Sequence, residues 1–270
     1  MKLLCCGDVV GKSGRRVVAE HLPRLRQDLA VDFTIVNGEN AAHGLGITEG
    51  ICNGFFEAGA DVVTTGNHVW DQREIMNTID DEPRLLRPIN YPAGTPGRGF
   101  NVYEDGAGRR VLVVQPMGRL FMDPLDDPFA AVDALLAKHK LGENVDCIIV
   151  DMHAEATSEK MAMGHFCDGR ASMVVGTHTH VPTADAQILP GGTAFQTDLG
   201  MCGDYDSVIG MQKEVALARF TKKLPAGRLE PAGGAATLCA VLVETDDATG
   251  LATRIAPVRV GGRLIERLPD

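Results

Sequence analysis

The sequence lacks the marks of several large protein classes. None of its 7 cysteines is spaced as CxxC, the pairing expected of a cysteine-ligated structural zinc site. An odd number of cysteines cannot pair completely, and Cys5, Cys6, Cys147 and Cys239 lie within apolar runs, as reduced thiols of cytosolic proteins do. No apolar stretch approaches the roughly 20 residues that a membrane-spanning helix needs. We therefore expect a soluble protein without a membrane partner.

Positive charge is also scarce. The chain carries 26 basic and 36 acidic side chains, a net charge of −10, and such a field repels duplex nucleic acid. A small phosphorylated molecule is not excluded, because a bound cation reverses the sign of the charge locally. The N-terminus begins with a strand-like run at residues 2–6 in place of the apolar region of a signal peptide, so we expect a cytoplasmic location.

Short apolar runs alternate with longer amphipathic segments. Runs at 2–6, 31–36, 61–65, 111–115, 146–151 and 172–176 predict buried strands, and segments near 14–29, 48–58, 71–79 and 127–140 predict helices. The regions 185–196 and 237–260 favour antiparallel strands. This order predicts an α/β fold in which two sheets lie face to face with helices outside. Because no linker or internal repeat interrupts it, the simplest interpretation is one domain over residues 1–270.

Five polar residues follow predicted strands almost immediately: Asp8, Glu39, Asn67, His153 and His178. In open α/β sheets, the carboxyl ends of the strands form the crevice in which ligands bind. Side chains that are far apart in the sequence are therefore expected to converge at one edge of the sheets.

The segment Gly176-Thr177-His178-Thr179-His180 is the most specific of these motifs. In an extended chain, residues i and i+2 point the same way and lie roughly 6–7 Å apart. Two imidazoles so placed suit two metal ions about 3.5–4 Å apart. The alternative, two surface histidines placed by chance, is weaker because histidine is scarce in this chain.

The other motifs are ambiguous when each is taken alone. Glu39 has two oxygens with which to bridge two cations, and Asn40 adds an amide oxygen, yet this Asn-Gly-Glu-Asn segment is also typical of a turn. Asn67 offers an oxygen ligand or a helix cap, and His68 offers a titratable group. His153 is either a ligand or a polar residue at a strand end. The whole set of Asp, Glu, Asn and His side chains suits manganese, iron or zinc.

The segment Gly7-Asp8-Val9-Val10-Gly11-Lys12-Ser13 has some likeness to a phosphate-binding P-loop. The spacing fails, because the first glycine of that motif would have to stand at position 6, which is Cys6. A P-loop also has no use for a carboxylate at Asp8. We interpret the segment as a strand-to-helix turn that presents Asp8 as a metal ligand.

Together, these motifs resemble the calcineurin-like metallophosphoesterase superfamily. Its pattern has an Asp after the first strand, a bridging acid after the second, then Gly-Asn-His, a lone His and Gly-x-His-x-His. Two departures, the absence of a His at Asp8-Val9-Val10 and the presence of Glu39-Asn40, resemble one subfamily, the YmdB-like phosphodiesterases. There the Asn takes the place of the missing His. Blocks at 66–70, 177–185 and 196–201 also match this subfamily.

The resemblance implies a four-layer α/β/β/α sandwich of two mixed sheets. It also implies two divalent or mixed-valence metal ions, iron or manganese, with zinc and magnesium as alternatives. It assigns one ion to Asp8, Glu39, Asn40 and His180, and the other to Glu39, Asn67, His153 and His178. It makes His68 the proton donor. Apart from the resemblance, Asp71 stands three residues after His68 and is a candidate to orient its ring. Two divalent ions outweigh the two carboxylates, so such a centre would attract a phosphodiester anion.

The activity that the resemblance implies is hydrolysis of phosphodiesters, with 2′,3′- and 3′,5′-cyclic nucleotides as substrates. A phosphomonoesterase or nucleotidase with the same centre stays open as an alternative. So does a regulatory nucleotide-sensing protein with weak catalysis. The sequence leaves a homo-oligomer open as well.

Overall fold

The computed structural model describes residues 1–222 and 227–269. Its helices are α1 (Gly11–Asp28), α2 (Glu49–Glu57), α3 (Ile75–Thr78), α4 (Pro128–Leu136), α5 (Thr157–Phe166) and α6 (Lys213–Lys222). Its strands are β1 (Lys2–Cys6), β2 (Asp8–Val9), β3 (Phe33–Asn37), β4 (Val62–Thr64), β5 (Leu85–Leu86), β6 (Phe100–Glu104), β7 (Arg110–Val114), β8 (Cys147–His153), β9 (Met173–Thr177), β10 (Gln187–Ile188), β11 (Ala194–Gln196), β12 (Met201–Asp204), β13 (Ala236–Thr245) and β14 (Ala252–Val260).

The strands form two sheets. The first has the order β2-β12-β13-β1-β3-β4-β5, with β14 paired to β13, and the second has the order β10-β11-β9-β8-β7-β6. In the first sheet β1, β3, β4 and β5 run parallel, and in the second β7, β8, β9 and β11 do. Because parallel neighbours end at the same edge, each sheet gathers the residues that follow its strands along one edge.

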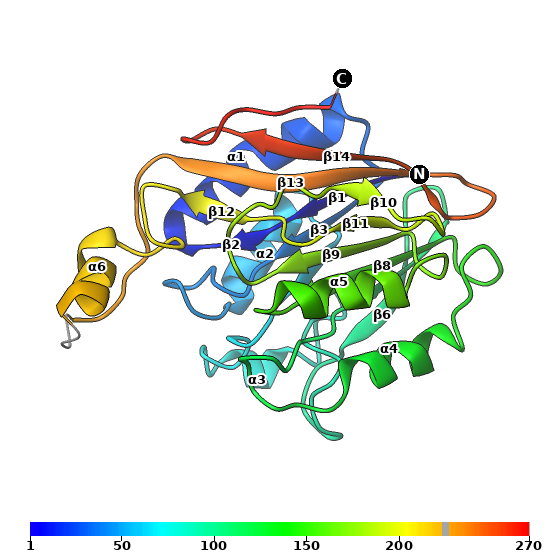
Figure 1. Cartoon of the computed structure of the whole chain (residues 1–270), viewed down its shortest axis with the longest axis horizontal. Helices are drawn as coiled ribbons and strands as arrows, with labels where there is room; N and C mark the ends of the chain where they lie inside the picture. The colour runs from blue at the N-terminus through cyan, green and yellow to red at the C-terminus, as the bar shows by residue number, and fades with distance from the viewer. Residues whose placement is uncertain (223–226, 270) are drawn as a thin grey trace.

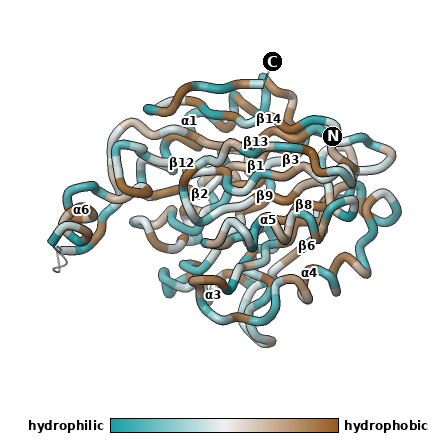
Figure 2. Tube along the Cα trace, in the orientation of Figure 1, coloured by the Kyte–Doolittle hydropathy of each residue, from teal (hydrophilic) through white to brown (hydrophobic). Residues whose placement is uncertain are grey.

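The sheets stack because their strands are apolar on both faces. Along β1, Leu4 packs in a cluster with Leu22 of α1, whereas the preceding Leu3 packs in a cluster with Ile149 of the second sheet. A third cluster joins the outer face of the second sheet to α4 and α5. Figure 1 shows α1 on one side of the stacked sheets and α4 and α5 on the other, and Figure 2 shows hydrophobic residues along the central strands. The predicted four-layer sandwich is confirmed.

Two helices begin where the sequence supplies a cap. Thr48 accepts a hydrogen bond from Ile51 N at the start of α2. Asp127 accepts from Phe129 N and Ala130 N at the start of α4, where a proline occupies the first helical position. A side-chain oxygen at this place satisfies amides that have no partner within the helix. The boundaries of α2 and α4 therefore fall close to the predicted ones.

Some predicted boundaries are wrong, and several elements were not predicted. Within the predicted helix at 71–79, helical structure is confined to Ile75–Thr78. The helix α5 lacks an apolar stripe because it buries Glu159 and Lys160. The helix α6 buries Ala216 and projects from the body of the molecule (Figure 1). The strand β6 is an edge strand whose side chains are half-buried or exposed, so it gives no signal of a buried strand.

The cysteines agree with a further prediction. All seven cysteines are unpaired and buried, as expected for reduced thiols. In the described part of the chain, no helix combines the length and the apolar character that crossing a membrane requires.

Candidate metal centre

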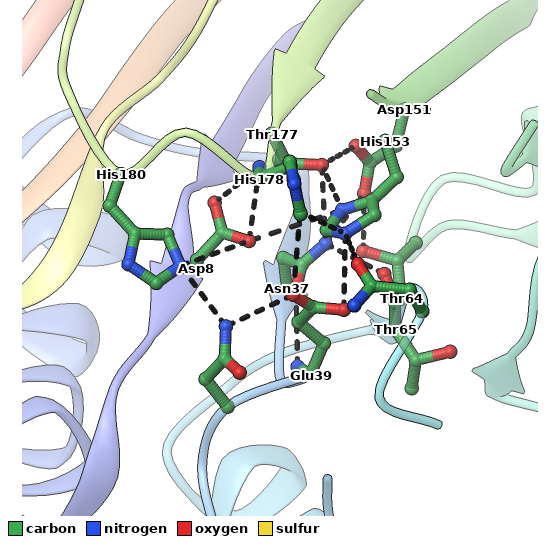
Figure 3. A network of polar contacts seen from close by, with 12 residues as sticks. Asp8, Asn37, Glu39, Thr64, Thr65, Asp151, His153, Thr177, His178 and His180 are labelled. Atoms are coloured by element: carbon green, nitrogen blue, oxygen red, sulfur yellow. Dashed lines mark hydrogen bonds and ion pairs between the residues drawn. The ribbon is translucent and has the colours of Figure 1, made fainter. Parts of the chain in front are cut away.

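The seven predicted metal ligands come together where the two sheets meet. Asp8, Glu39, Asn40 and Asn67 lie in or follow strands of the first sheet, and His153, His178 and His180 end or follow strands of the second. Figure 3 shows Asp8, Glu39, His153, His178 and His180 pointing toward one another from these elements. Asp8, Glu39, Asn40, His153 and His180 are buried. The centre therefore draws on both layers of strands.

One group of potential ligands surrounds His153. Glu39 Oε2 lies 3.1 Å from His153 Nε2, and Asn67 Oδ1 lies 3.0 Å from the same nitrogen. His178 Nδ1 is 3.2 Å away from it. Glu39, His153 and His178 together form a set whose ligand atoms all lie within 4.8 Å of one another.

A second group shares Glu39 and surrounds Asp8. Asp8, Glu39 and His180 offer ligand atoms that also lie within 4.8 Å of one another. Asn40 Nδ2 lies 3.0 Å from Glu39 Oε1 and 3.0 Å from His180 Nε2. A half-turn of the Asn40 amide puts its oxygen in that place. Glu39 thus presents one oxygen to each group.

Two of the histidines have an outer partner that fixes Nε2 as an acceptor. Thr177 Oγ1 donates to Asp151 Oδ1 at 2.8 Å and so accepts from His153 Nδ1 at 2.9 Å. His180 Nδ1 donates to the carbonyl of Ile209 at 2.8 Å. When these two rings are neutral, as metal binding requires, Nε2 is left with its lone pair facing the centre. Such outer hydrogen bonds orient metal-binding imidazoles and raise their basicity.

His178 is held in the opposite sense. Its Nε2 lies 3.2 Å from Glu155 Oε2, so a proton on Nε2 leaves the lone pair on Nδ1. Nδ1 is the nitrogen that faces His153 and Glu39. Burial and the neighbouring charge of His153 lower the pKa of His178 to about 3. The ring is therefore neutral at physiological pH, which is the form that binds a cation.

The buried carboxylates of Asp8 and Glu39 need a positive charge nearby to stay ionised. Burial raises the pKa of Asp8 to about 6, against the opposing effect of His180 and His153. Burial also opposes ionisation of Glu39, but His153 outweighs it and holds the pKa of Glu39 well below its usual range. Burial opposes a charge on His153, but Glu39 and Asp8 together raise its pKa. Two buried carboxylates side by side call for a cation between them.

The donor set fits divalent metal ions. When the imidazoles are neutral and oriented as above, Asn67 Oδ1, Glu39 Oε2 and His178 Nδ1 all present lone pairs to His153 Nε2, which has a lone pair of its own. Four acceptors cannot bond to one another, whereas a cation among them is bound by all four. A Cβ at Gly66 would overlap Glu39 Oε2 and His153 Nε2, so glycine leaves room for this approach.

The loop that carries His178 and His180 is held from outside the centre. Both residues have positive φ, 98° and 65°, a conformation that costs energy for residues other than glycine. Asp198 accepts from Thr179 N at 3.1 Å and from Thr179 Oγ1 at 2.8 Å. Lys160 Nζ of α5 lies 2.6 Å from the same Asp198 carboxylate, and both side chains are buried. This ion pair stabilises the loop between the two histidines.

His68 lies beside the ligands without joining either group. Its Nδ1 is 2.9 Å from Asp71 Oδ2, and its backbone amide donates to Glu39 Oε2 at 3.3 Å. It lines a cavity of about 230 Å³ together with Glu39, His178 and His180. With Nδ1 held by Asp71, the other ring nitrogen is the one left for a bound molecule.

Sequence reasoning missed the outer partners of the histidines. Glu155 stands two residues after His153, and alternation along an extended chain would have pointed to it. Thr177 lies within the Gly-x-His-x-His motif, and Asp151 two residues before His153. The pairing of Lys160 with Asp198 left no such signal, because the two residues are 38 positions apart.

Comparison with known proteins agrees with this geometry. A family described as "YmdB-like protein" matches residues 4–258. The 2′,3′-cyclic-nucleotide 2′-phosphodiesterase of Bacillus subtilis (strain 168) is 49% identical over 260 residues, which cover 96% of this chain and 97% of that protein. A hypothetical protein from Thermus thermophilus has a similar structure, with a TM-score of 0.90, 47% identity and coverage of 97% of this chain and 100% of that one. A phosphatase from Mycoplasma pneumoniae also has a TM-score of 0.90, with 33% identity and coverage of 100% and 95%. Its fold, its motifs and its similarity to these relatives along nearly the whole chain show that the protein belongs to the YmdB-like protein family.

Proposed function

We propose that the protein is a phosphodiesterase with a centre of two metal ions, and that it hydrolyses 2′,3′- and 3′,5′-cyclic nucleotides. The observation that carries this proposal is the pair of ligand groups that share the Glu39 carboxylate. The cyclic-nucleotide phosphodiesterase name of the Bacillus subtilis relative supports the substrate class. Because both sheets supply ligands, the domain that acts is the whole chain, residues 1–270.

The ligands are assigned by their grouping. One ion takes Asp8, Glu39, Asn40 and His180, and the other takes Glu39, Asn67, His153 and His178. Mixed oxygen and imidazole ligands suit iron or manganese, with zinc and magnesium as the alternatives. When bound, two such ions supply positive charge that stabilises a phosphoryl group during in-line displacement.

The residues of the chain position the substrate and handle its protons. Water attacks the phosphorus and releases one proton to the solvent, and the bond from phosphorus to the ribose oxygen breaks; His68 regains a proton from the solvent after each turnover. His68 gives a proton to the departing ribose oxygen, while Asp71 Oδ2, 2.9 Å from His68 Nδ1, holds the ring in place. The half-buried position of His68 at the cavity wall gives a substrate access to this proton.

Metal analysis tests the centre. Protein purified without chelator or added metal should contain two ions per chain, iron or manganese, and both should give anomalous scattering at the shared Glu39. A single isolated ion in metal-loaded protein would contradict the assignment.

A substrate panel tests the reaction. Metal-loaded protein should hydrolyse bis-p-nitrophenyl phosphate and cyclic nucleotides. The phosphatase name of the Mycoplasma pneumoniae structure makes a phosphomonoesterase the second candidate. Robust turnover of monoesters with no turnover of diesters would favour that candidate over ours.

A further inference from the structure

A cavity of about 200 Å³ lies apart from the metal centre, with no lining residue in common with the cavity at the metal ligands. It forms where β14 of the first sheet contacts β10 and β11 of the second. Its walls include the polar side chains of Thr183 and Gln196 and two arginines, Arg259 and Arg267.

The two arginines are held beside each other. Arg259 and Arg267 face each other in an antiparallel bridge, with backbone hydrogen bonds of 2.7 and 2.9 Å in the two directions. Directly opposed residues of such a pair carry their side chains on the same face, where like charges repel. Within residues 1–222 and 227–269, neither guanidinium has a carboxylate within 4.0 Å. An anion between them would remove the repulsion.

Two residues that line the cavity have buried polar atoms without a hydrogen-bond partner among the described residues. One is Oε1 of Gln196, whose residue is 2% exposed, and another is Nε of Arg259. The orientation of the Gln196 amide is set, because its Nε2 donates to the carbonyls of Thr183 and Asp198 at 3.2 and 2.9 Å. The cavity wall therefore includes an acceptor of fixed orientation on Gln196 and cationic donors on Arg259 and Arg267. A buried polar group without a hydrogen-bond partner lowers the stability of the fold. A ligand that accepts from Arg259 and donates to Gln196 would therefore bind favourably.

We propose that this cavity binds a phosphate group that keeps one hydroxyl hydrogen. The arginines donate to its charged oxygens, and its P–OH donates to Gln196 Oε1. Guanidinium groups match phosphate geometry well, and these charge-assisted bonds are the strong ones. A volume of about 200 Å³ holds a phosphate with a few further atoms but is small for a whole nucleotide. The ligand is thus inorganic phosphate, which keeps a P–OH near neutral pH, whereas a phosphomonoester is by then mostly a dianion without one.

Titration of the metal-loaded protein with anions tests the proposal. Inorganic phosphate should bind more tightly than sulfate, because sulfate carries no hydrogen near neutral pH and cannot satisfy Gln196. Arg259→Met keeps the apolar stem of the side chain and should weaken phosphate binding at least about tenfold. Arg110→Met is the matched control, since Arg110 is an exposed residue of β7 outside the cavity. The wild type, Arg259→Met and Arg110→Met all bind phosphate at the metal centre in the same way. A difference in phosphate affinity among them therefore comes from the cavity.

Methyl phosphate is the second anion control, because above about pH 7 it is mostly a dianion without a P–OH. It should bind as weakly as sulfate, and binding as tight as that of inorganic phosphate would overturn the role of Gln196. Crystals grown with phosphate should show it between Arg259 and Gln196 Oε1. Equal phosphate affinity in Arg259→Met and Arg110→Met would overturn the proposal, provided that thermal unfolding shows both variants folded. Arg267→Met repeats the test if Arg259→Met does not fold. Equal affinity for sulfate and phosphate would overturn the role of Gln196.

Discussion

At the scale of single residues, His68 differs from the neighbouring Asn67 in what its side chain contacts. Asn67 points at His153, whereas the His68 ring contacts Asp71. His68→Ala should therefore leave about two metal ions per chain. It should slow hydrolysis of a cyclic nucleotide by roughly 10²–10⁴, because ribose is a poor leaving group that needs a proton. The loss should be much smaller for bis-p-nitrophenyl phosphate, whose leaving group needs little protonation. Steady-state rates and metal analysis of the same preparation give the comparison.

Glu39→Ala provides the contrast to that variant. It removes the carboxylate shared by both groups of ligands, so metal content should fall at both sites. If His68→Ala also strips a metal, or slows both substrates equally, then His68 is a ligand or holds the phosphate, and its role as proton donor is wrong.

Gly66 tests how closely the ligands are packed. A methyl group at this position would overlap Glu39 Oε2 and His153 Nε2, whereas a methyl group at Gly54 in α2 meets nothing within 4 Å. Gly66→Ala should therefore lower metal content and activity at least about tenfold, since displaced ligands bind weakly. Gly54→Ala should keep full activity and stabilise the helix by about 0.5–1 kcal/mol. Metal analysis and thermal unfolding compare the pair. Full metal content in Gly66→Ala would show that the centre adjusts more freely than its packing indicates.

The sequence predicted the metal ligands better than the residues that form hydrogen bonds to those ligands. Predicted ligands such as His178 and His180 stand just after a strong apolar run, and the structure brings both to the centre, His178 beside His153 and His180 beside Asn40. Alternation along the chain could have pointed to Glu155, but which histidine nitrogen Glu155 and Thr177 contact depends on ring orientations that the sequence pattern does not give.

At the scale of elements, α5 supports the histidine loop through one buried ion pair. Lys160→Met leaves the Asp198 carboxylate buried without its cation, and breaking such a pair costs about 3–5 kcal/mol. Thermal unfolding should show a drop in Tm on the order of 10 °C. The double variant Lys160→Met, Asp198→Asn removes both charges and should recover more than half of the loss. Its metal affinity should stay reduced, because the amide holds Thr179 less tightly than the carboxylate. An unchanged Tm in Lys160→Met would show that the pair contributes little.

The helix α5 also shows why some elements were not predicted from the sequence. The strands β1, β3, β8 and β9 are buried on both faces and form continuous apolar runs, so their existence was clear from the sequence. In α5 the buried positions include Glu159 and Lys160, whose burial depends on partners elsewhere in the chain. An apolar stripe is the signal for a buried helix, and here tertiary contacts replace it.

At the scale of the whole molecule, the metal centre lies across the boundary between the two sheets. Removal of the ions should therefore lower the stability of the entire fold. At a metal concentration about 1,000 times the dissociation constant, binding contributes about 4 kcal/mol. A chelator should lower the Tm of the wild-type protein by several degrees, and readdition of metal should restore it. The Glu39→Ala variant, which binds metal poorly, should show almost no response to the chelator. A Tm that ignores the chelator in wild type would mean that the centre is not linked to stability.

Because ligands come from both sheets, metal occupancy also depends on how the two sheets are aligned. Side chains that join the layers, such as Ile149 and Val175, lie in the core between them and are not among the metal ligands. A small change there, such as Ile149→Val, costs only about 0.5–1.5 kcal/mol, yet it lets one sheet slide slightly over the other. Each sheet would carry its own share of the ligands with it, so metal occupancy would report such a displacement directly, and the lost metal would lower the Tm further than the lost methyl group does.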